Sequence, residues 1–206
     1  MEPVPLVHVL DDDPSMRSAV SSLLRSVGIE VQTYGSVREF LEAGRPDVEG
    51  CLVLDIRMPG TGGLELQEQL QSLGVQLPVV LMTGFGDIPM TVRGMRAGAV
   101  DFLAKPFRDQ DMLDAVSAAL ARDRVRRASG RERAEAEARL ATLSPRERQV
   151  MELVVEGLMN KQVAGELGLS LVTVKIHRGA AMRKMGARTL PDLVRLAALL
   201  GLGRSG

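Results

Sequence analysis

Short apolar runs alternate with stretches of helical spacing along the first part of the chain. The runs are apolar at successive residues, which is typical of strands covered on both faces of a sheet. Between them, apolar residues recur every three or four positions, as in amphipathic helices, and glycine follows several of the expected helix ends. The predicted strands span residues 5–10, 29–34, 51–55, 78–82 and 100–103.

This alternation predicts an α/β fold with a doubly wound, five-stranded parallel sheet. Right-handed crossovers leave few possible topologies, and in the expected strand order the first and third strands are neighbours. Residues 142–206 contain no convincing strand. They predict an all-α domain of four helices.

The predicted helices of this second region begin at typical caps. Ser144 starts the first one, because a serine cap with glutamate three residues later, here Glu147, forms a capping box. Ser170 and Thr189 are placed to cap two later helices. A short glycine-containing turn between two of the helices indicates a helix-turn-helix. The predicted helices span residues 145–156, 160–167, 171–185 and about 190–200.

Residues 123–141 are interpreted as a charged, largely helical linker between a first domain of residues 1–122 and a second of residues 142–206. Ser129 and Gly130 predict a break in it, because both favour turns over helix interiors. No apolar heptad persists, so the pattern does not favour a coiled coil.

The charge of the chain is zero overall but unevenly divided. Residues 1–122 carry 10 Lys and Arg against 17 Asp and Glu, whereas residues 123–206 carry 16 against 9. The basic second region suits a polyanion such as double-stranded DNA. With only Cys51 an intrachain disulfide is excluded, and no apolar run approaches the ~20 residues of a membrane span. We therefore expect a cytoplasmic protein with no membrane partner.

Polar residues follow the predicted strands of the first region. Asp11 and Asp12 follow the first strand, Asp55 ends the third, Thr83 follows the fourth and Lys105 the fifth. Because the carboxyl ends of parallel strands meet at one sheet edge, we expect these groups to converge. Carboxylates suit a divalent cation, an aspartate can accept a phosphoryl group, and lysine and threonine can bind its oxygens.

These residues resemble the receiver domain of bacterial two-component response regulators, which has a flavodoxin-like fold. The resemblance covers residues 1–122 and is carried by four stretches, Asp11-Asp12-Asp13, Asp55-Ile56-Arg57-Met58-Pro59-Gly60, Thr83-Gly84 and Asp101-Phe102-Leu103-Ala104-Lys105-Pro106-Phe107.

The resemblance assigns a role to each of these residues. Asp55 is implied to be the phospho-acceptor and Lys105 the group that binds the phosphoryl oxygens. Thr83 and Phe102 are implied to form a switch pair, and a cis peptide bond is expected at Lys105–Pro106. The implied cofactor is Mg²⁺, or another divalent cation such as Mn²⁺. Its implied ligands are Asp12 and Asp55 directly, Asp11 through a water molecule, and the backbone carbonyl of Arg57.

Residues 142–203 resemble the LuxR-type DNA-binding domain through residues 143–150, 157–164, 169–170 and 173–177. The whole chain resembles the NarL/FixJ class, closest in appearance to its FixJ and StyR branch. A recognition helix near residues 171–185 is expected in the major groove. Its core contacts are predicted to be Val172, Val174, Ile176 and Met182. The predicted base contacts are Lys175 and Arg178, and the predicted phosphate contacts are Ser170, Thr173, Lys161, Arg183 and Lys184. His177 is expected either to read bases or to serve as a packing or phosphate contact.

Together these features predict a transcriptional regulator switched by phosphorylation. A sensor histidine kinase is expected to phosphorylate Asp55, and the added charge to drive homodimerisation through residues 87–97, 100–103 and 108–121. Two DNA-binding domains then reach two half-sites on one DNA, and we expect the protein to activate transcription with RNA polymerase. No enzymatic activity is expected beyond phosphorylation and dephosphorylation of Asp55 itself.

The sequence leaves two other functions open. One is a Mg²⁺-dependent phosphatase with Asp55 as nucleophile, although haloacid-dehalogenase-type enzymes have a second Asp where this chain has Arg57. The other is a constitutive DNA-binding protein with a vestigial pocket. The complete set of Asp12, Asp55, Thr83 and Lys105 argues against that interpretation.

Overall fold

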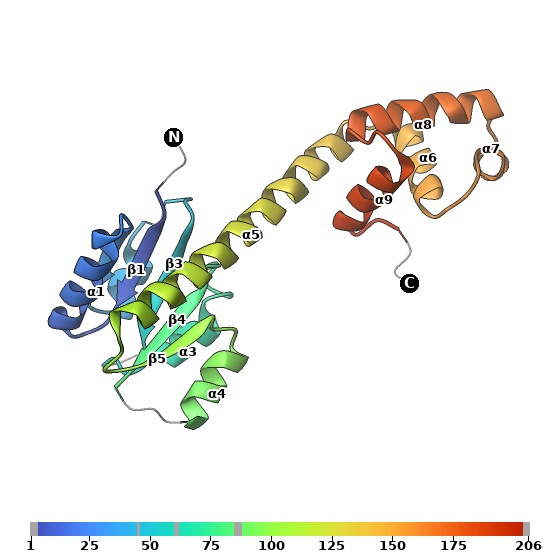
Figure 1. Cartoon of the computed structure of the whole chain (residues 1–206). Coiled ribbons are helices and arrows are strands. Elements are labelled where there is room, and N and C mark those ends of the chain that lie inside the picture. Colours follow the sequence, from blue (N-terminus) through green and yellow to red (C-terminus); the bar gives the residue numbers. More distant parts are fainter. Residues whose placement is uncertain (1–3, 45, 60–61, 85–87, 204–206) are drawn as a thin grey trace. The chain divides into compact units, whose positions relative to one another are not determined.

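The computed structural model of the chain describes residues 4–44, 46–59, 62–84 and 88–203. The chain forms two compact units, residues 1–127 and residues 128–206. The first unit contains a five-stranded parallel sheet with the strand order β2-β1-β3-β4-β5 (Figure 1). Its strands are β1 (Leu6–Leu10), β2 (Glu30–Tyr34), β3 (Gly50–Asp55), β4 (Val79–Thr83) and β5 (Asp101–Ala104). The predicted strands and the pairing of the first with the third are confirmed.

Helices cover both faces of this sheet. One core cluster joins apolar residues of the sheet to α1 (Pro14–Ser26) and α5 (Asp109–Ala141). The other joins the opposite face to α2 (Val37–Glu42), α3 (Gly63–Gln69) and α4 (Ile88–Arg96). The first residue of the helix predicted over residues 87–97 lies outside the described residues. The central strand β3 is buried along its whole length, which explains why its residues before Asp55 are apolar.

Cys51 lies in this core and is fully buried. Burial, with a smaller contribution from the charge of Asp123, raises the pKa of the Cys51 thiol to about 12. The nucleophilic thiolate is therefore absent at neutral pH. Cys51 therefore acts as a small buried hydrophobe of the core.

The first unit extends past residue 122 into the segment predicted to be a linker. Asp123 on α5 is completely buried. Its Oδ2 accepts hydrogen bonds from the backbone N–H of Gly50 (3.0 Å) and from Nε of Arg127 (2.7 Å). Its Oδ1 accepts from Nε of Arg126 (2.8 Å). These contacts attach the helix to the start of β3.

The predicted break at Ser129 and Gly130 is wrong, because α5 runs through both residues. Glycine costs a helix interior only about 1 kcal/mol relative to alanine. That cost is small beside the contacts made by the helix on either side. Upstream Asp123 is anchored as described, and downstream Ala136 lies in the core of the second unit.

The second unit contains the last part of α5 and the helices α6 (Pro145–Val155), α7 (Asn160–Leu167), α8 (Leu171–Met185) and α9 (Leu190–Leu199). The four predicted helices and their caps are confirmed: Ser144 and Glu147 form the capping box, Ser170 caps α8 and Thr189 caps α9. Gly168 ends α7 with a positive φ of 65°, which makes the tight turn to α8. In the part of the chain that the structure describes, no helix has the length and apolar character needed to cross a membrane.

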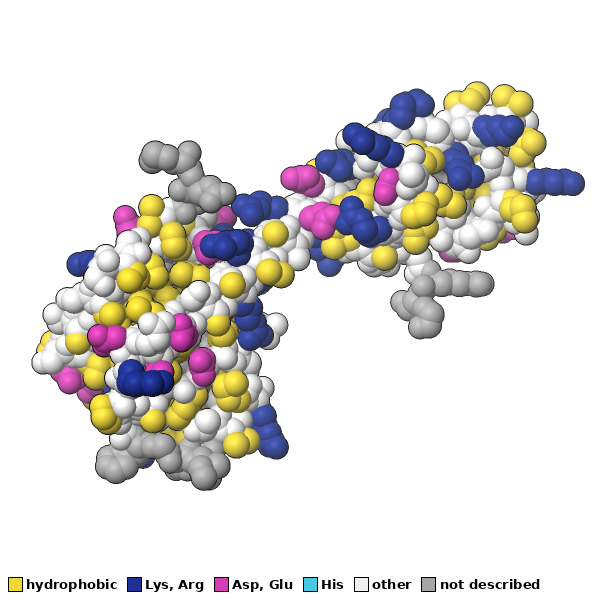
Figure 2. Space-filling view, viewed as in Figure 1, with side chains coloured by type: hydrophobic (Ala, Val, Ile, Leu, Met, Phe, Trp, Pro, Cys, Tyr) yellow, Lys and Arg dark blue, Asp and Glu magenta, His cyan; other side chains and the backbone are white. Residues whose placement is uncertain are grey.

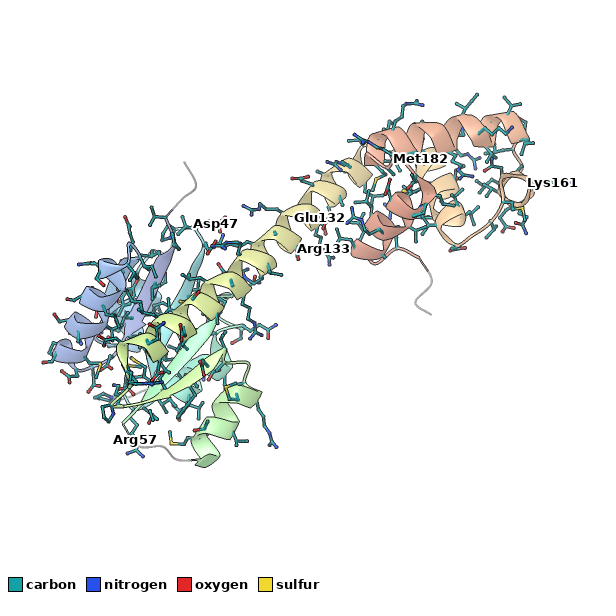
Figure 3. All side chains as sticks on the ribbon, viewed as in Figure 1. Asp47, Arg57, Glu132, Arg133, Lys161 and Met182 are labelled. Carbon is teal, nitrogen blue, oxygen red and sulfur yellow. The ribbon has the colours of Figure 1, made fainter. Side chains whose placement is uncertain are left out.

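The end of α5 is part of the packing of this unit. Ala136 is buried and Leu140 packs against the same core as Val150 and Met185. Glu132, labelled on α5 in Figure 3, pairs with Arg195 of α9. Residues 128–141 therefore share a core with the helix-turn-helix.

Candidate functional site

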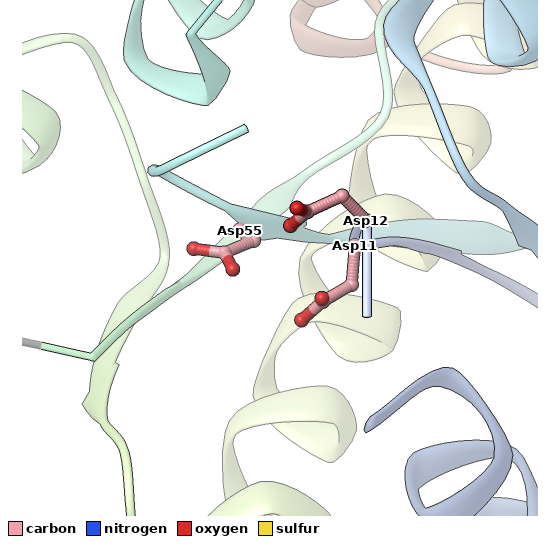
Figure 4. Close-up of side chains that lie close together, drawn as sticks. All are labelled: Asp11, Asp12 and Asp55. Carbon is pink, nitrogen blue, oxygen red and sulfur yellow. The ribbon is translucent and has the colours of Figure 1, made fainter. Parts of the chain in front are cut away.

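Three carboxylates converge at the carboxyl end of the sheet, as predicted (Figure 4). Leu10 pairs with Leu54, so the residues that follow on β1 and β3 come side by side. One carboxylate oxygen each of Asp11, Asp12 and Asp55 lies within 4.8 Å of the other two. Asp11 and Asp55 are buried, whereas Asp12 is exposed. Solvent therefore reaches the cluster at Asp12.

Lys105, which follows β5, joins two of these carboxylates. Its Nζ lies 2.6 Å from Oδ2 of Asp11 and 2.7 Å from Oδ2 of Asp55. Burial disfavours the ammonium, but the hydrogen bonds that it donates to both carboxylates outweigh this effect and raise the pKa of Lys105. Burial also raises the pKa of Asp11, against the hydrogen bonds from Lys105 and Asp13.

Backbone groups fix the direction of the carboxylates. Oδ1 of Asp11 accepts from the N–H of Asp13 (2.9 Å), and Oδ1 of Asp55 accepts from the N–H of Arg57 (3.0 Å). The side chain of Arg57 is exposed at this edge of the first unit (Figure 3). The role of its carbonyl as a metal ligand stays a prediction.

The donor set of the cluster is suited to a hard divalent cation. Its ligand atoms are carboxylate oxygens, with no His or Cys in the cluster as described. Oxygen donors favour Mg²⁺ or Mn²⁺ over softer metals. Carboxylates this close repel one another, and a dication offsets that repulsion. The residues present therefore fit the predicted cation.

The predicted switch residues lie on the two strands beside the cluster. Thr83 ends β4 and is buried, and its backbone carbonyl accepts from the N–H of Lys105 (2.7 Å). Phe102 pairs with Leu81 across β4 and β5 and is partly buried. The predicted cis peptide bond at Lys105–Pro106 is confirmed. The structure thus brings Thr83 close to Lys105, while the switching movement itself stays a prediction.

In the second unit, two of the four residues predicted to face the core from α8 do not. Val174 is buried and Met182 is partly buried, as expected. Val172 and Ile176, however, are 67% and 63% exposed. The buried face repeats at Val174, Ala181 and Met185, and helical spacing places Val172 and Ile176 on the opposite side.

The exposed face of α8 therefore carries both charged and apolar groups. Its exposed residues include Val172, Lys175, Ile176 and Arg183, which helical spacing places on one side of the helix. Figure 2 shows several Lys and Arg side chains over this helix. Hydrophobicity alone places Val172 and Ile176 in the core, which is why the sequence did not predict them on this face. The spacing of the buried positions would have identified them.

Two predicted DNA contacts have partners within the second unit. Nη1 of Arg178 donates to Oδ1 of Asn160 on α7 (2.9 Å). Nζ of Lys184 donates to Oε2 of Glu147 (2.6 Å) and to the carbonyl of Thr142 (3.0 Å). Both side chains hold α8 against neighbouring segments. Their contacts with DNA stay predictions.

The other predicted DNA contacts lie near the helix-turn-helix turn or along α8. The hydroxyl of Ser170 accepts from the N–H of Thr173 (3.1 Å), and the two hydroxyls lie 2.8 Å apart. Lys161 is exposed at the start of α7 (Figure 3), and His177 is partly buried on α8. The start of α8 thus carries the hydroxyls of Ser170 and Thr173, which are hydrogen-bonded to each other.

Comparison with known proteins matches both units. Residues 7–117 match the family model of the response regulator receiver domain, and residues 141–197 that of the bacterial regulatory proteins of the luxR family. Nodulation protein W of Bradyrhizobium diazoefficiens is 56% identical over 96% of this chain and 87% of its own length. The transcriptional regulatory protein FixJ of Azorhizobium caulinodans is 46% identical over 95% of this chain and 93% of its own.

Among solved structures, the response regulator StyR is 49% identical, with a TM-score of 0.82. The match covers 95% of this chain and 99% of StyR. Family models thus match both units, and these relatives extend along nearly the whole length. The chain belongs to the response regulators of the NarL/FixJ class, with a receiver domain followed by a LuxR-type DNA-binding domain.

Proposed function

We propose that this response regulator is switched by phosphorylation of Asp55 and that the switch controls its binding to promoter DNA. The observation that carries the proposal is the convergence of Asp55 with Asp11, Asp12 and Lys105 at one sheet edge. The phosphoryl donor is a sensor histidine kinase in the cytoplasm. The chain's own catalysis is limited to its phosphorylation and dephosphorylation.

The acidic cluster and Lys105 supply the groups that this phosphoryl transfer needs. A carboxylate oxygen of Asp55 attacks phosphorus, the new O–P bond forms, and the bond from phosphorus to the donor breaks. Asp11, Asp12 and Asp55 would hold Mg²⁺, and the bound ion would supply positive charge to the phosphoryl oxygens. Lys105 is already within hydrogen-bond distance of Asp55. After the transfer, its ammonium pairs with the phosphoryl oxygens, which carry the negative charge in place of the carboxylate. The carbonyl of Arg57 is the remaining proposed ligand.

Phosphorylation at the acidic cluster would change the surface formed by α4, β5 and the start of α5. Thr83 turns to donate its hydroxyl to the phosphoryl group, and Phe102 moves into the space it leaves. This surface includes exposed apolar residues on α4, Val92 and Met95, each 44% exposed. We propose that it forms the homodimer that then recruits RNA polymerase as an activator.

The experiment that tests the switch is a gel shift on genomic fragments with and without acetyl phosphate and Mg²⁺. We expect phosphorylated protein to bind its fragments more tightly, because a dimer engages two half-sites at once. Equal affinity under both conditions would instead support a constitutive DNA-binding protein. Steady release of phosphate from a phosphate ester would support the phosphatase.

From the exposed face of α8 we predict that Lys175 reads DNA bases. Lys175→Ala should weaken binding to a specific site by about 1–3 kcal/mol and leave binding to random DNA almost unchanged. The matched control is Arg148→Ala, which removes one charge from α6, where Arg148 pairs with Glu152. Competition gel shifts with specific and random duplexes measure the difference. An equal loss on both duplexes would make Lys175 a phosphate contact.

A further inference from the structure

Arg17 on α1 contacts the acidic cluster from its backbone side. Its Nη1 donates to the carbonyl oxygen of Asp11 (2.7 Å) and to that of Asp12 (3.0 Å). The guanidinium also lies close to the turn between β2 and α2, since a Cβ placed on Gly35 would be 3.5 Å from Nη1. Arg17 is partly buried. It is therefore held in place beside the loop that carries two of the carboxylates.

These two hydrogen bonds constrain the loop in a way that matters for a cation. Two successive carbonyls drawn to one nitrogen fix the peptide between Asp11 and Asp12. Hydrogen bonds from a charged donor are roughly twice as strong as neutral ones. This backbone restraint adds to the restraints that Lys105 and the N–H of Asp13 place on the Asp11 side chain, and it opposes the mutual repulsion of the carboxylates. The positive charge of Arg17 by itself disfavours a nearby dication, so the expected gain in affinity comes from the fixed backbone.

We infer that Arg17 is a positioning residue that preorganises Asp11 and Asp12 for the divalent cation. The inference rests on the proposed function, since it concerns the same cation site. Arg17 itself does not bind the cation; it holds the backbone from which two ligands project. Groups that hold metal ligands in place commonly change metal affinity by about 10–100-fold when removed.

The same helix supplies a matched control. Arg25, at the other end of α1, also donates to a backbone carbonyl, that of Val31 (3.0 Å). This hydrogen bond does not involve any residue of the acidic cluster. Loss of Arg25 therefore tests what an arginine-to-carbonyl hydrogen bond from α1 contributes to stability alone.

The test measures Mg²⁺ affinity in the full chain by calorimetric titration with MgCl₂, without a phosphoryl donor. Arg17→Met keeps the aliphatic stem but loses the donors, and should raise the Mg²⁺ dissociation constant about tenfold. Arg17→Lys keeps a charged donor and should recover part of this loss. Arg25→Met should bind Mg²⁺ like the wild type. Fluorescence of buried Tyr34, the single tyrosine in a chain without tryptophan, verifies that each receiver is folded.

The outcomes separate this inference from the proposed function. If the wild type does not bind Mg²⁺, the proposed cation site is wrong. If the wild type binds Mg²⁺ and folded Arg17→Met binds it equally well, Arg17 has only a structural role and the inference is overturned. An equal loss of affinity in Arg25→Met would also overturn it, because the effect would then belong to α1 as a whole.

Discussion

The Asp55→Asn variant is expected to accept no phosphoryl group and to bind DNA equally well with and without acetyl phosphate. The amide is not a nucleophile, so the O–P bond cannot form. Its carbonyl oxygen can still accept from the N–H of Arg57, and Lys105 keeps its bond to Asp11. The fold should therefore survive while the switch is lost. Phosphate-affinity electrophoresis after incubation with acetyl phosphate and Mg²⁺ measures the labelled fraction.

Asp101→Asn is the control for this variant. Asp101 lies at the start of β5, where its exposed carboxylate accepts from the N–H of Phe102 (2.8 Å), and it should be labelled like the wild type. Labelling of Asp55→Asn at the wild-type level would show that another residue accepts the phosphoryl group. That result would remove Asp55 from the proposed mechanism.

The Asp123→Ala variant should lose about 3 kcal/mol of receiver stability. Removing the carboxylate leaves the N–H of Gly50 without its acceptor and takes an ion-pair partner from Arg126 and Arg127. Breaking a buried ion pair costs more than the pair itself contributes, since the remaining charges stay desolvated. Urea unfolding followed by Tyr34 fluorescence reports on this unit alone, because the chain has no other tyrosine and no tryptophan.

Asp47→Ala is the matched control for this second variant. Asp47 also pairs with Arg127, but its side chain is 97% exposed (Figure 3). Exposed ion pairs contribute little, so the unfolding midpoint should stay close to that of the wild type. If both variants unfolded at the wild-type urea concentration, the buried network around Asp123 would not be what anchors α5.

The acidic cluster could be predicted from the sequence because two simple rules determine it. Apolar runs such as residues 51–54 are typical of strands buried on both faces, and parallel strands bring their carboxyl ends to one edge. Asp55 and Asp11 then have to be neighbours, whatever the side-chain details. Helix caps such as Ser144 were predictable for a similar reason, since they depend on residues only three positions apart.

Features that depend on long-range contacts were not predictable in this way. Asp123 stands in a run of charges that suggests a solvated linker, and only folding places it under β3 beside Gly50. Arg17 contacts backbone carbonyls, which leave no trace in the residue pattern. Val172 and Ile176 were wrongly assigned because hydrophobicity alone does not say which side of a helix faces the core.

The division of α8 into two faces has a consequence for how such regulators diverge. Val174, Ala181 and Met185 hold the helix in its core, while Val172, Lys175 and Ile176 carry almost none of that packing. Substitutions at the outward positions can therefore accumulate without unfolding the domain. Under the proposed base reading by this face, a few codon changes in a gene copy would be enough to select new promoters while the receiver stays the same.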